Sequence, residues 1–154
     1  MLRRLPHPSP LLAAALLLSA CGSSSTKLED LNTTIVTLPD GNKIVAETMV
    51  RDIDLQRGMM FRDALPDGHG MILIEATMGK FPVWTYNCRI PLDVVWINSG
   101  LRVVEILTNL PPCPSSSAKS CPRYGGKEQA RYVLELKGGD VARYGLKVGD
   151  TLSF

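Results

Sequence analysis

Histidine is scarce in this sequence, since its 154 residues include only two, His7 and His69. The sequence has no Cys-x-x-Cys pair, no glycine-rich phosphate loop and no Gly-x-Ser-x-Gly turn of the esterase type. These absences argue against a metal centre, against nucleotide binding of the phosphate-loop type and against esterase chemistry. We therefore expect neither a metal nor a cofactor.

Long hydrophobic runs are also missing. The N-terminal run, Leu11–Leu18, has eight residues, far short of the roughly 20 that a membrane-spanning helix needs. Two arginines precede this run, and two small residues and then Cys21 follow it. The arrangement predicts a signal peptide over residues 1–20 and resembles a bacterial lipobox, which implies cleavage before Cys21 and lipidation of its thiol. The alternative is an ordinary signal peptide cut near Ala20, with Cys21 left as a plain thiol.

Residues 21–31 include the polar stretch Gly22–Thr26, which predicts a flexible tether between the lipid and the domain. Gly22 does not resemble the aspartate that retains some lipoproteins at the inner membrane, so the outer membrane is favoured. We expect an exported protein of the bacterial cell envelope, lipid-anchored at Cys21 to a membrane that faces the periplasm.

An excess of one charge is absent as well. The chain has 17 basic and 15 acidic residues, and loss of Arg3 and Arg4 with the signal peptide leaves 15 of each. A neutral domain lacks the basic face that dominates binding to nucleic acid phosphates. We expect no nucleic acid partner; the expected partners are the membrane, a small-molecule ligand or an envelope protein.

Residues 32–154 are predicted to form a single β-rich domain. Residues 131–137 alternate, which places Tyr132, Leu134 and Leu136 on a buried face. We expect a mainly β fold, that is α+β with little helix, in a single compact barrel- or sandwich-like domain of seven to eight strands. Helical turns are predicted near residues 52–58 and 140–144, and strands at residues 32–38, 43–49, 71–75, 80–87, 92–98, 102–107, 131–137 and 151–154.

The three cysteines after Cys21 divide into a pair and a single thiol. Cys113 and Cys121 lie in a loop rich in proline and serine, where an oxidising compartment favours a disulfide over a metal site. Cys88 is the odd thiol. It would be a nucleophile if a neighbouring cation lowered its pKa, but the favoured interpretation is a small buried cysteine without reactivity.

Two arginines and an acid form the next candidate group. Arg57 and Arg62 could hold a carboxylate or phosphate in bidentate fashion, with Asp93 orienting one of them. The alternative is that one arginine pairs with Asp93 and no ligand is involved. Trp84 could line a groove or fill the core, whereas core packing is favoured for Trp96.

Three motifs carry a family resemblance. They are Arg57–Arg62 (Arg-Gly-Met-Met-Phe-Arg), Gly70–Leu73 (Gly-Met-Ile-Leu) and Trp84–Asp93 (Trp-Thr-Tyr-Asn-Cys-Arg-Ile-Pro-Leu-Asp), followed by the closing turn Gly145–Asp150. Together they resemble the family called domain of unknown function 192, over roughly residues 33–154. The resemblance implies a small, mostly β domain, often exported, without an established activity.

The central motif departs from the usual family pattern, Trp-Met-Lys-Asn-Thr before Ile-Pro-Leu-Asp. Cys88 stands where the family has threonine, which weakens a thiol mechanism. Any pocket that the family shares would involve the positions of this sequence that carry polar or aromatic groups in the motifs: Arg57, Arg62, Trp84, Asn87 and Asp93.

Two functions remain open from the sequence. The favoured one is a non-catalytic binding or accessory module for a small polar or anionic ligand or an envelope partner. The alternative is an envelope hydrolase or transferase that uses Asp93 or Cys88 with an arginine clamp.

Overall fold

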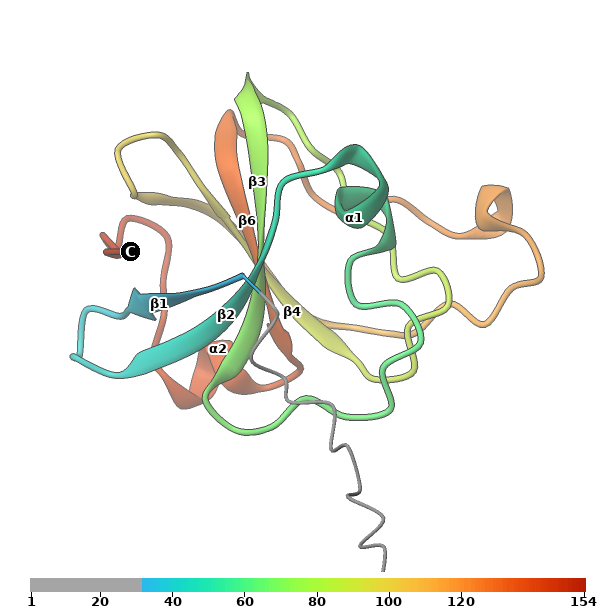
Figure 1. The fold of residues 1–154 in the computed structure, drawn as a ribbon, viewed down its shortest axis with the longest axis horizontal. Coiled ribbons are helices and arrows are strands. Elements are labelled where there is room, and N and C mark those ends of the chain that lie inside the picture. Colours follow the sequence, from blue (N-terminus) through green and yellow to red (C-terminus); the bar gives the residue numbers. More distant parts are fainter. Residues whose placement is uncertain (1–31) are drawn as a thin grey trace, which may run out of the picture.

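A computed structural model describes residues 32–154, so the predicted signal peptide, Cys21 and the tether lie outside the described residues. One six-stranded sheet, in the order β1-β2-β3-β6-β4-β5, dominates the domain (Figure 1). Within residues 32–154 no helix has the length and apolar character to cross a membrane. The elements are β1 (Thr33–Thr37), β2 (Lys43–Met49), α1 (Asp52–Arg57), β3 (His69–Gly79), β4 (Leu92–Ile97), β5 (Val103–Leu110), the 3-10 turn η2 (Ala118–Ser120), β6 (Ala130–Lys137) and α2 (Asp140–Arg143).

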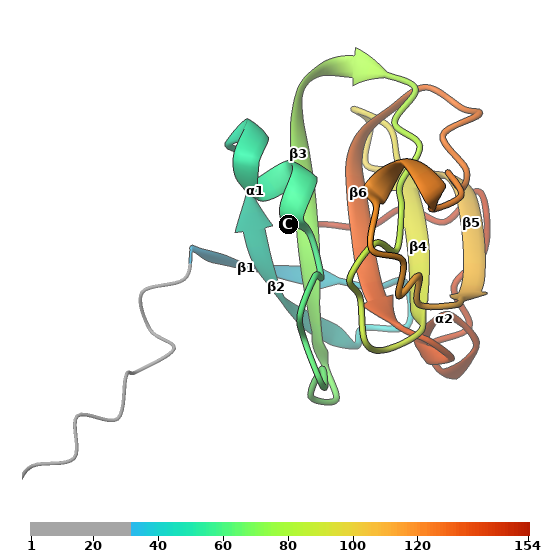
Figure 2. The same ribbon diagram turned by 90° about the vertical axis from the view of Figure 1, so that its right-hand side faces the viewer.

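The sheet is antiparallel except between β2 and β3, which run parallel. Parallel neighbours need a crossover connection, because a tight turn can join only antiparallel strands. The crossover here contains α1, and residues 58–68 return the chain to the start of β3. This connection brings the first family-like motif, residues 57–62, beside the sheet (Figure 2).

The prediction of a mainly β domain with one or two short helices is confirmed, and the described residues form two. The sheet is not a closed barrel, however, and it has six strands in place of the predicted seven to eight. Residues 151–154, predicted to be a strand, form only two isolated bridges, Thr151 with Arg102 and Ser153 with Thr37. One bridge is to the residue before the edge strand β5 and the other is to the opposite edge strand, β1. The segment therefore does not pair continuously with either strand.

The strand predicted at residues 80–87 is wrong. β3 continues to Gly79, beyond the predicted end of its strand at residue 75, and the chain is then irregular up to β4 apart from single bridges at Val83 and Tyr86. Pro82 has no N–H to donate to a ladder. Asn87 has a φ of 53°, a left-handed conformation that ends extended structure.

Both faces of the sheet are buried. Leu134 and Leu136 belong to one apolar cluster, and the preceding residue Val133, which points to the opposite face of the strand, belongs to the other. The prediction of a buried face on β6 is confirmed for the two leucines, while Tyr132 is half-buried. Trp96 is fully buried, and its indole N–H donates to the Phe81 carbonyl at 2.8 Å. The irregular segment before β4 therefore covers the second face of the sheet.

The predicted disulfide joins Cys113 to Cys121 across a sequence separation of 8. Replacing both residues by serine is expected to lower the free energy of unfolding by roughly 2–3 kcal/mol, because the bond restricts the unfolded chain. Urea denaturation of the oxidised protein and of the double variant measures this difference. The double variant serves as its own control, since a reducing agent should not shift its midpoint; equal stability of the two proteins would contradict the expectation.

Candidate functional site

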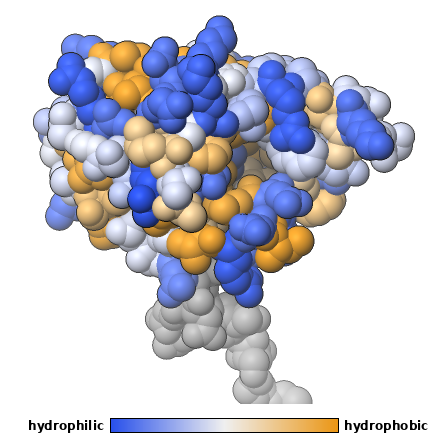
Figure 3. Space-filling view, turned by 90° about the horizontal axis from the view of Figure 1, so that it is seen from above, coloured by the Kyte–Doolittle hydropathy of each residue, from blue (hydrophilic) through white to orange (hydrophobic). Residues whose placement is uncertain are grey.

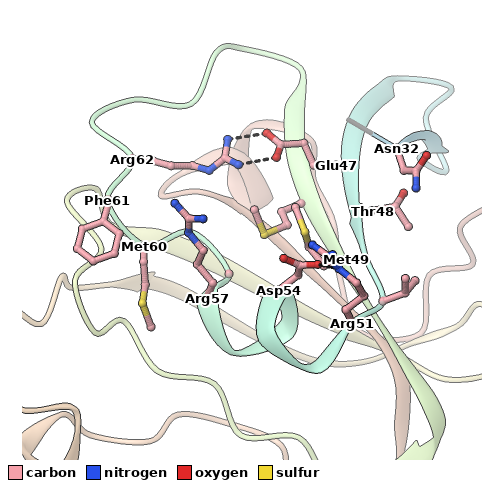
Figure 4. Close-up of a pocket in the computed structure, with 13 residues that line it drawn as sticks. Asn32, Glu47, Thr48, Met49, Arg51, Asp54, Arg57, Met60, Phe61 and Arg62 are labelled. Atoms are coloured by element: carbon pink, nitrogen blue, oxygen red, sulfur yellow. Dashed lines mark hydrogen bonds and ion pairs between the residues drawn. The ribbon is translucent and has the colours of Figure 1, made fainter. Parts of the chain in front are cut away.

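Two hollows adjoin the C-terminal end of α1, and Arg57 and Gly58 line both of them. The first has a volume of about 630 Å³ and the second about 550 Å³. Volumes in this range are typical of small-molecule sites. The first hollow is bounded by charged residues from β2, α1 and the segment after it, and Figure 4 shows their side chains: Glu47, Arg51, Asp54, Arg57 and Arg62.

Local sequence explains where α1 ends. Asp52 and Asp54 in its first turn and Arg57 in its last turn complement the helix dipole. Gly58 follows with a φ of 44°, which favours glycine because it has no Cβ. The helix therefore stops directly after Arg57, and that side chain lies at the boundary between the two hollows.

Arg62 forms a bidentate ion pair with Glu47 of β2. Its Nη1 lies 2.5 Å from Glu47 Oε1, and its Nη2 contacts Oε2 (Figure 4). The alternative in which Arg62 or Arg57 pairs with Asp93 is thus wrong for Arg62, whose partner is Glu47. A partly buried bidentate pair holds Arg62 in place and engages much of its capacity to bind an anion.

Arg57 differs from the arginines around it. Arg51 pairs with Asp54 at 2.5 Å and Arg62 pairs with Glu47, but Arg57 forms no ion pair with any acid of residues 32–154. Its guanidinium extends from α1 toward the Arg62 and Glu47 pair (Figure 4). The structure therefore brings Arg57 and Arg62 together, and only Arg57 keeps its donors for another group.

Asp93 lies away from this site. On β4 it pairs in register with Leu136 of β6, which belongs to the apolar cluster on the opposite face of the sheet. Its carboxylate accepts backbone N–H groups from Asn109 at 2.7 Å, Gly139 at 3.0 Å and Val141 at 2.8 Å. The expectation that Asp93 orients an arginine is therefore wrong, because the sheet separates the two and Asp93 instead anchors the start of α2.

Asn87 acts through its backbone. Its carbonyl accepts the Phe61 N–H at 2.9 Å and its own N–H donates to the Cys113 carbonyl at 3.2 Å. It borders neither hollow. Asparagine tolerates the left-handed conformation found here better than most residues do, so the turn accounts for the residue type.

Trp84 lines the second hollow, where it is half-buried. Its indole N–H donates to the Gln56 carbonyl at 3.2 Å, and the Arg123 guanidinium lies 3.9 Å from the ring centroid. Tyr86 packs against it in a tilted arrangement, with ring centroids 5.8 Å apart. Trp84 is thus fixed against the last turn of α1 and forms an aromatic wall next to Arg57.

Sequence reasoning missed Glu135, which lies on the hollow side of β6. Residues that pair in register form one row across β2, β3, β6 and β4 on this face of the sheet. The row consists of Glu47, Met71, Glu135 and Val94. Glu135 is 3% exposed. Burial raises the pKa of its carboxyl to about 7, although the Met59 N–H and the charge of Arg62 act to lower that pKa. The alternating pattern of β6 indicated an exposed position, so no sequence signal pointed to this acid.

Cys88 is buried in the apolar cluster on the same face as Glu135. Burial raises the pKa of its thiol to about 12, and the charge of Glu135 adds to this rise. A thiol with such a pKa stays protonated at neutral pH, and the thiolate is the nucleophilic form. Cys88 thus agrees with the interpretation favoured from the sequence, that of a small buried cysteine without reactivity.

The charged side chains that line the two hollows are mostly basic. Among residues 32–154 no three His, Cys, Asp or Glu side chains group as metal ligands. Both hollows instead carry a surplus of basic groups. The first has three arginines against two acids, Glu47 and Asp54, and the second has two arginines and Lys80 against Glu75 and Glu135, so each has a net charge of +1 with all groups ionised.

Comparisons with known proteins agree with this fold. A crystal structure of a protein of unknown function from Novosphingobium aromaticivorans DSM 12444 is similar with a TM-score of 0.71 and 28% identity, covering 83% of this chain and 89% of that one. A second, described as a "putative transcription regulator" from Sinorhizobium meliloti 1021, has a TM-score of 0.70 and 28% identity over 80% of this chain and 94% of that one. No curated protein matches the chain. The model of the DUF192 family, described as "Uncharacterized ACR", matches residues 35–154, and the chain belongs to this family.

Proposed function

We propose that the protein is a non-catalytic binding module that holds a small anionic ligand on Arg57. The observation that carries the proposal is the contrast among the three arginines of the first hollow, of which Arg57 alone lacks an acid partner within residues 32–154. A guanidinium presents paired N–H donors that match a carboxylate or phosphate. Arg57 therefore supplies charge and geometry for such a group.

A small ligand fits better than a broad protein interface on the face seen in Figure 3. Hydrophobic residues there occur in separate patches among hydrophilic ones. Extensive interfaces with other proteins are favoured by large contiguous apolar patches. The hollows, by contrast, are of small-molecule size and bring Arg57 next to an aromatic wall at Trp84.

The hydrolase or transferase alternative has less support. It requires Asp93 or Cys88 as the reacting group beside an arginine. Asp93 is fully buried with three backbone partners on the other face of the sheet, and the Cys88 thiol has a raised pKa. Asp93 is thus not placed next to Arg57, and the Cys88 thiol is not ionised for nucleophilic attack.

The proposed location is the periplasmic side of a bacterial membrane, with the outer membrane favoured. It rests on the sequence pattern of residues 1–31, which places the lipid on Cys21. Membrane fractionation of cells that express the full chain or its Cys21→Ser variant tests this point. The variant should move to the soluble fraction, and retention in the membrane fraction would contradict lipid anchoring.

Substitution of Arg57 provides the test of the ligand proposal. Succinate and inorganic phosphate serve as probes in isothermal titration and in thermal unfolding. A ligand present at 100 times its Kd should add about 2.7 kcal/mol to the free energy of unfolding. Arg57→Gln should weaken binding roughly tenfold or more, because a hydrogen bond to a charged group contributes about 1.5–3 kcal/mol.

Arg51→Gln is the matched control, since Arg51 lines the same hollow but already pairs with Asp54. It should leave affinity unchanged. Equal losses in the two variants would refute a specific role for Arg57. Failure of the unmodified protein to bind either probe would refute anion binding itself.

A further inference from the structure

Glu135 is a buried acid whose surroundings do not satisfy it. The Met59 N–H donates to its carboxyl, yet Oε2 has no hydrogen-bond partner among residues 32–154. Asp93 shows the opposite arrangement, with three backbone donors around one buried carboxylate. An unpartnered polar atom in the interior costs about 1–3 kcal/mol, so a role in stability does not explain Glu135.

Glu135 is one of the residues that line the second hollow, together with Arg57 and Trp84. Gly58 covers it from the α1 side: a Cβ at that position would lie 3.1 Å from Oε2 and 3.5 Å from Oε1. The glycine thus lets the chain pass close to the acid. Rotation about the last bond of a glutamate side chain is soft, which allows Oε2 to turn toward a group bound in the hollow.

We propose that Glu135 is a ligand-binding residue: in its protonated form it donates a hydrogen bond to a small organic carboxylate in the second hollow. The same carboxylate meets Arg57, so the inference rests on the proposed function of that arginine. The remainder of the ligand is flat and apolar, since the hollow is walled by Trp84, Phe81 and Val83. The site is therefore specific for an aromatic or similarly planar carboxylate.

The charges around Glu135 determine its protonation. Arg62, from the segment after α1, stabilises the ionised carboxyl, and Cys88, from the segment before β4, lies near enough for the two to interact. The hollow adds Arg57, Lys80, Glu75 and Arg123. Burial outweighs the favourable charges and brings the pKa of Glu135 to about 7. A bound carboxylate stabilises the protonated form further, so binding takes up a proton.

Benzoate is the probe for this inference, with sulfate as an anion that lacks the planar part; the charge of neither changes between pH 6 and pH 8. Isothermal titration at both pH values, in two buffers of different ionisation enthalpy, gives the affinity and the number of protons taken up. If only the protonated form binds and the pKa is about 7, the affinity for benzoate should be roughly tenfold lower at pH 8 than at pH 6. Sulfate should bind more weakly than benzoate at pH 6.

The variant Glu135→Gln keeps an N–H donor that cannot ionise. It should bind benzoate with an affinity that does not change with pH and without proton uptake. The role of Glu135 would be overturned if the unmodified protein bound benzoate equally well at both pH values and took up no proton. If Arg57→Gln then still lost affinity for benzoate, the proposed function would stand. Absence of any benzoate or succinate binding would overturn both. The proton count needs only the unmodified protein, so it decides the question even if the variant does not fold.

Discussion

Replacement of Asp93 by Ala should lower the free energy of unfolding by at least about 4 kcal/mol. The change leaves three backbone N–H groups, of Asn109, Gly139 and Val141, without the carboxylate that accepts them. Each lost bond to a charged group contributes about 1.5–3 kcal/mol when the donor stays buried. Because two of these donors belong to the start of α2, that helix should detach from the sheet first.

Urea denaturation of the Asp93→Ala and Asp93→Asn variants measures this effect. The asparagine retains one acceptor oxygen and should cost about half as much. Asp63→Ala is the control, because Asp63 pairs with Arg89 on the surface and such pairs contribute about 0–1 kcal/mol. Succinate affinity of the folded Asp93 variants should stay unchanged. A loss of affinity with unchanged stability would instead place Asp93 in a binding site.

The position of Asp93 shows where sequence reasoning fails. Trp84 and Asp93 lie in one continuous motif, and this proximity in sequence suggested a shared site. β4 begins at Leu92, however, and successive residues of a strand point to opposite faces. Leu92 belongs to the apolar cluster on the face of the sheet that carries the hollows, whereas Asp93 accepts a hydrogen bond from the start of α2. A shift of one position along the strand thus moves a side chain from the face with the hollows to the face that carries α2. Strand propensity does not predict the start of a strand to within one residue.

Features with strong local causes could be predicted. The strand at 43–49 matches β2, whose strand-forming residues and preceding turn are plain in the sequence. The disulfide follows from two cysteines in one short irregular loop. Arg57 and Arg62 both line the first hollow because a single short connection carries them. In each case the partners lie close together in the sequence.

The acids of the site depend on distant parts of the chain. Glu47 and Glu135 occupy polar positions on alternating strands, where the sequence predicts solvent exposure. They are buried because the crossover containing α1 and the irregular segment before β4 cover that face of the sheet. Neither covering segment has a periodic pattern that would reveal its position. The burial of Glu135 and its raised pKa were therefore not predictable.

The stability of the domain should fall by roughly 3 kcal/mol between about pH 4.5 and pH 7 on account of Glu135 alone. Its pKa is raised from 4.5 to about 7 in the folded protein, so in this interval the folded state binds more protons than the unfolded state. The contribution of Glu135 to stability is then greatest below about pH 4.5 and decreases as pH rises toward 7, opposite in sign to that of an acid held ionised by a salt bridge. Above pH 7 the carboxylate is buried without adequate compensation.

Urea denaturation across pH 4–8 of the unmodified protein and of Glu135→Gln isolates this contribution. The two proteins should be similar near pH 4.5, where the glutamic acid is neutral, and the variant should be more stable by up to roughly 3 kcal/mol at pH 8. Glu128→Gln is the control: its side chain is exposed, so its curve should run parallel to that of the unmodified protein. A parallel curve for Glu135→Gln would mean that the pKa of Glu135 is not raised in the folded protein, so that the carboxylate is ionised at neutral pH. In that case it would act as a fixed negative charge beside Arg62 rather than as a proton donor in the hollow.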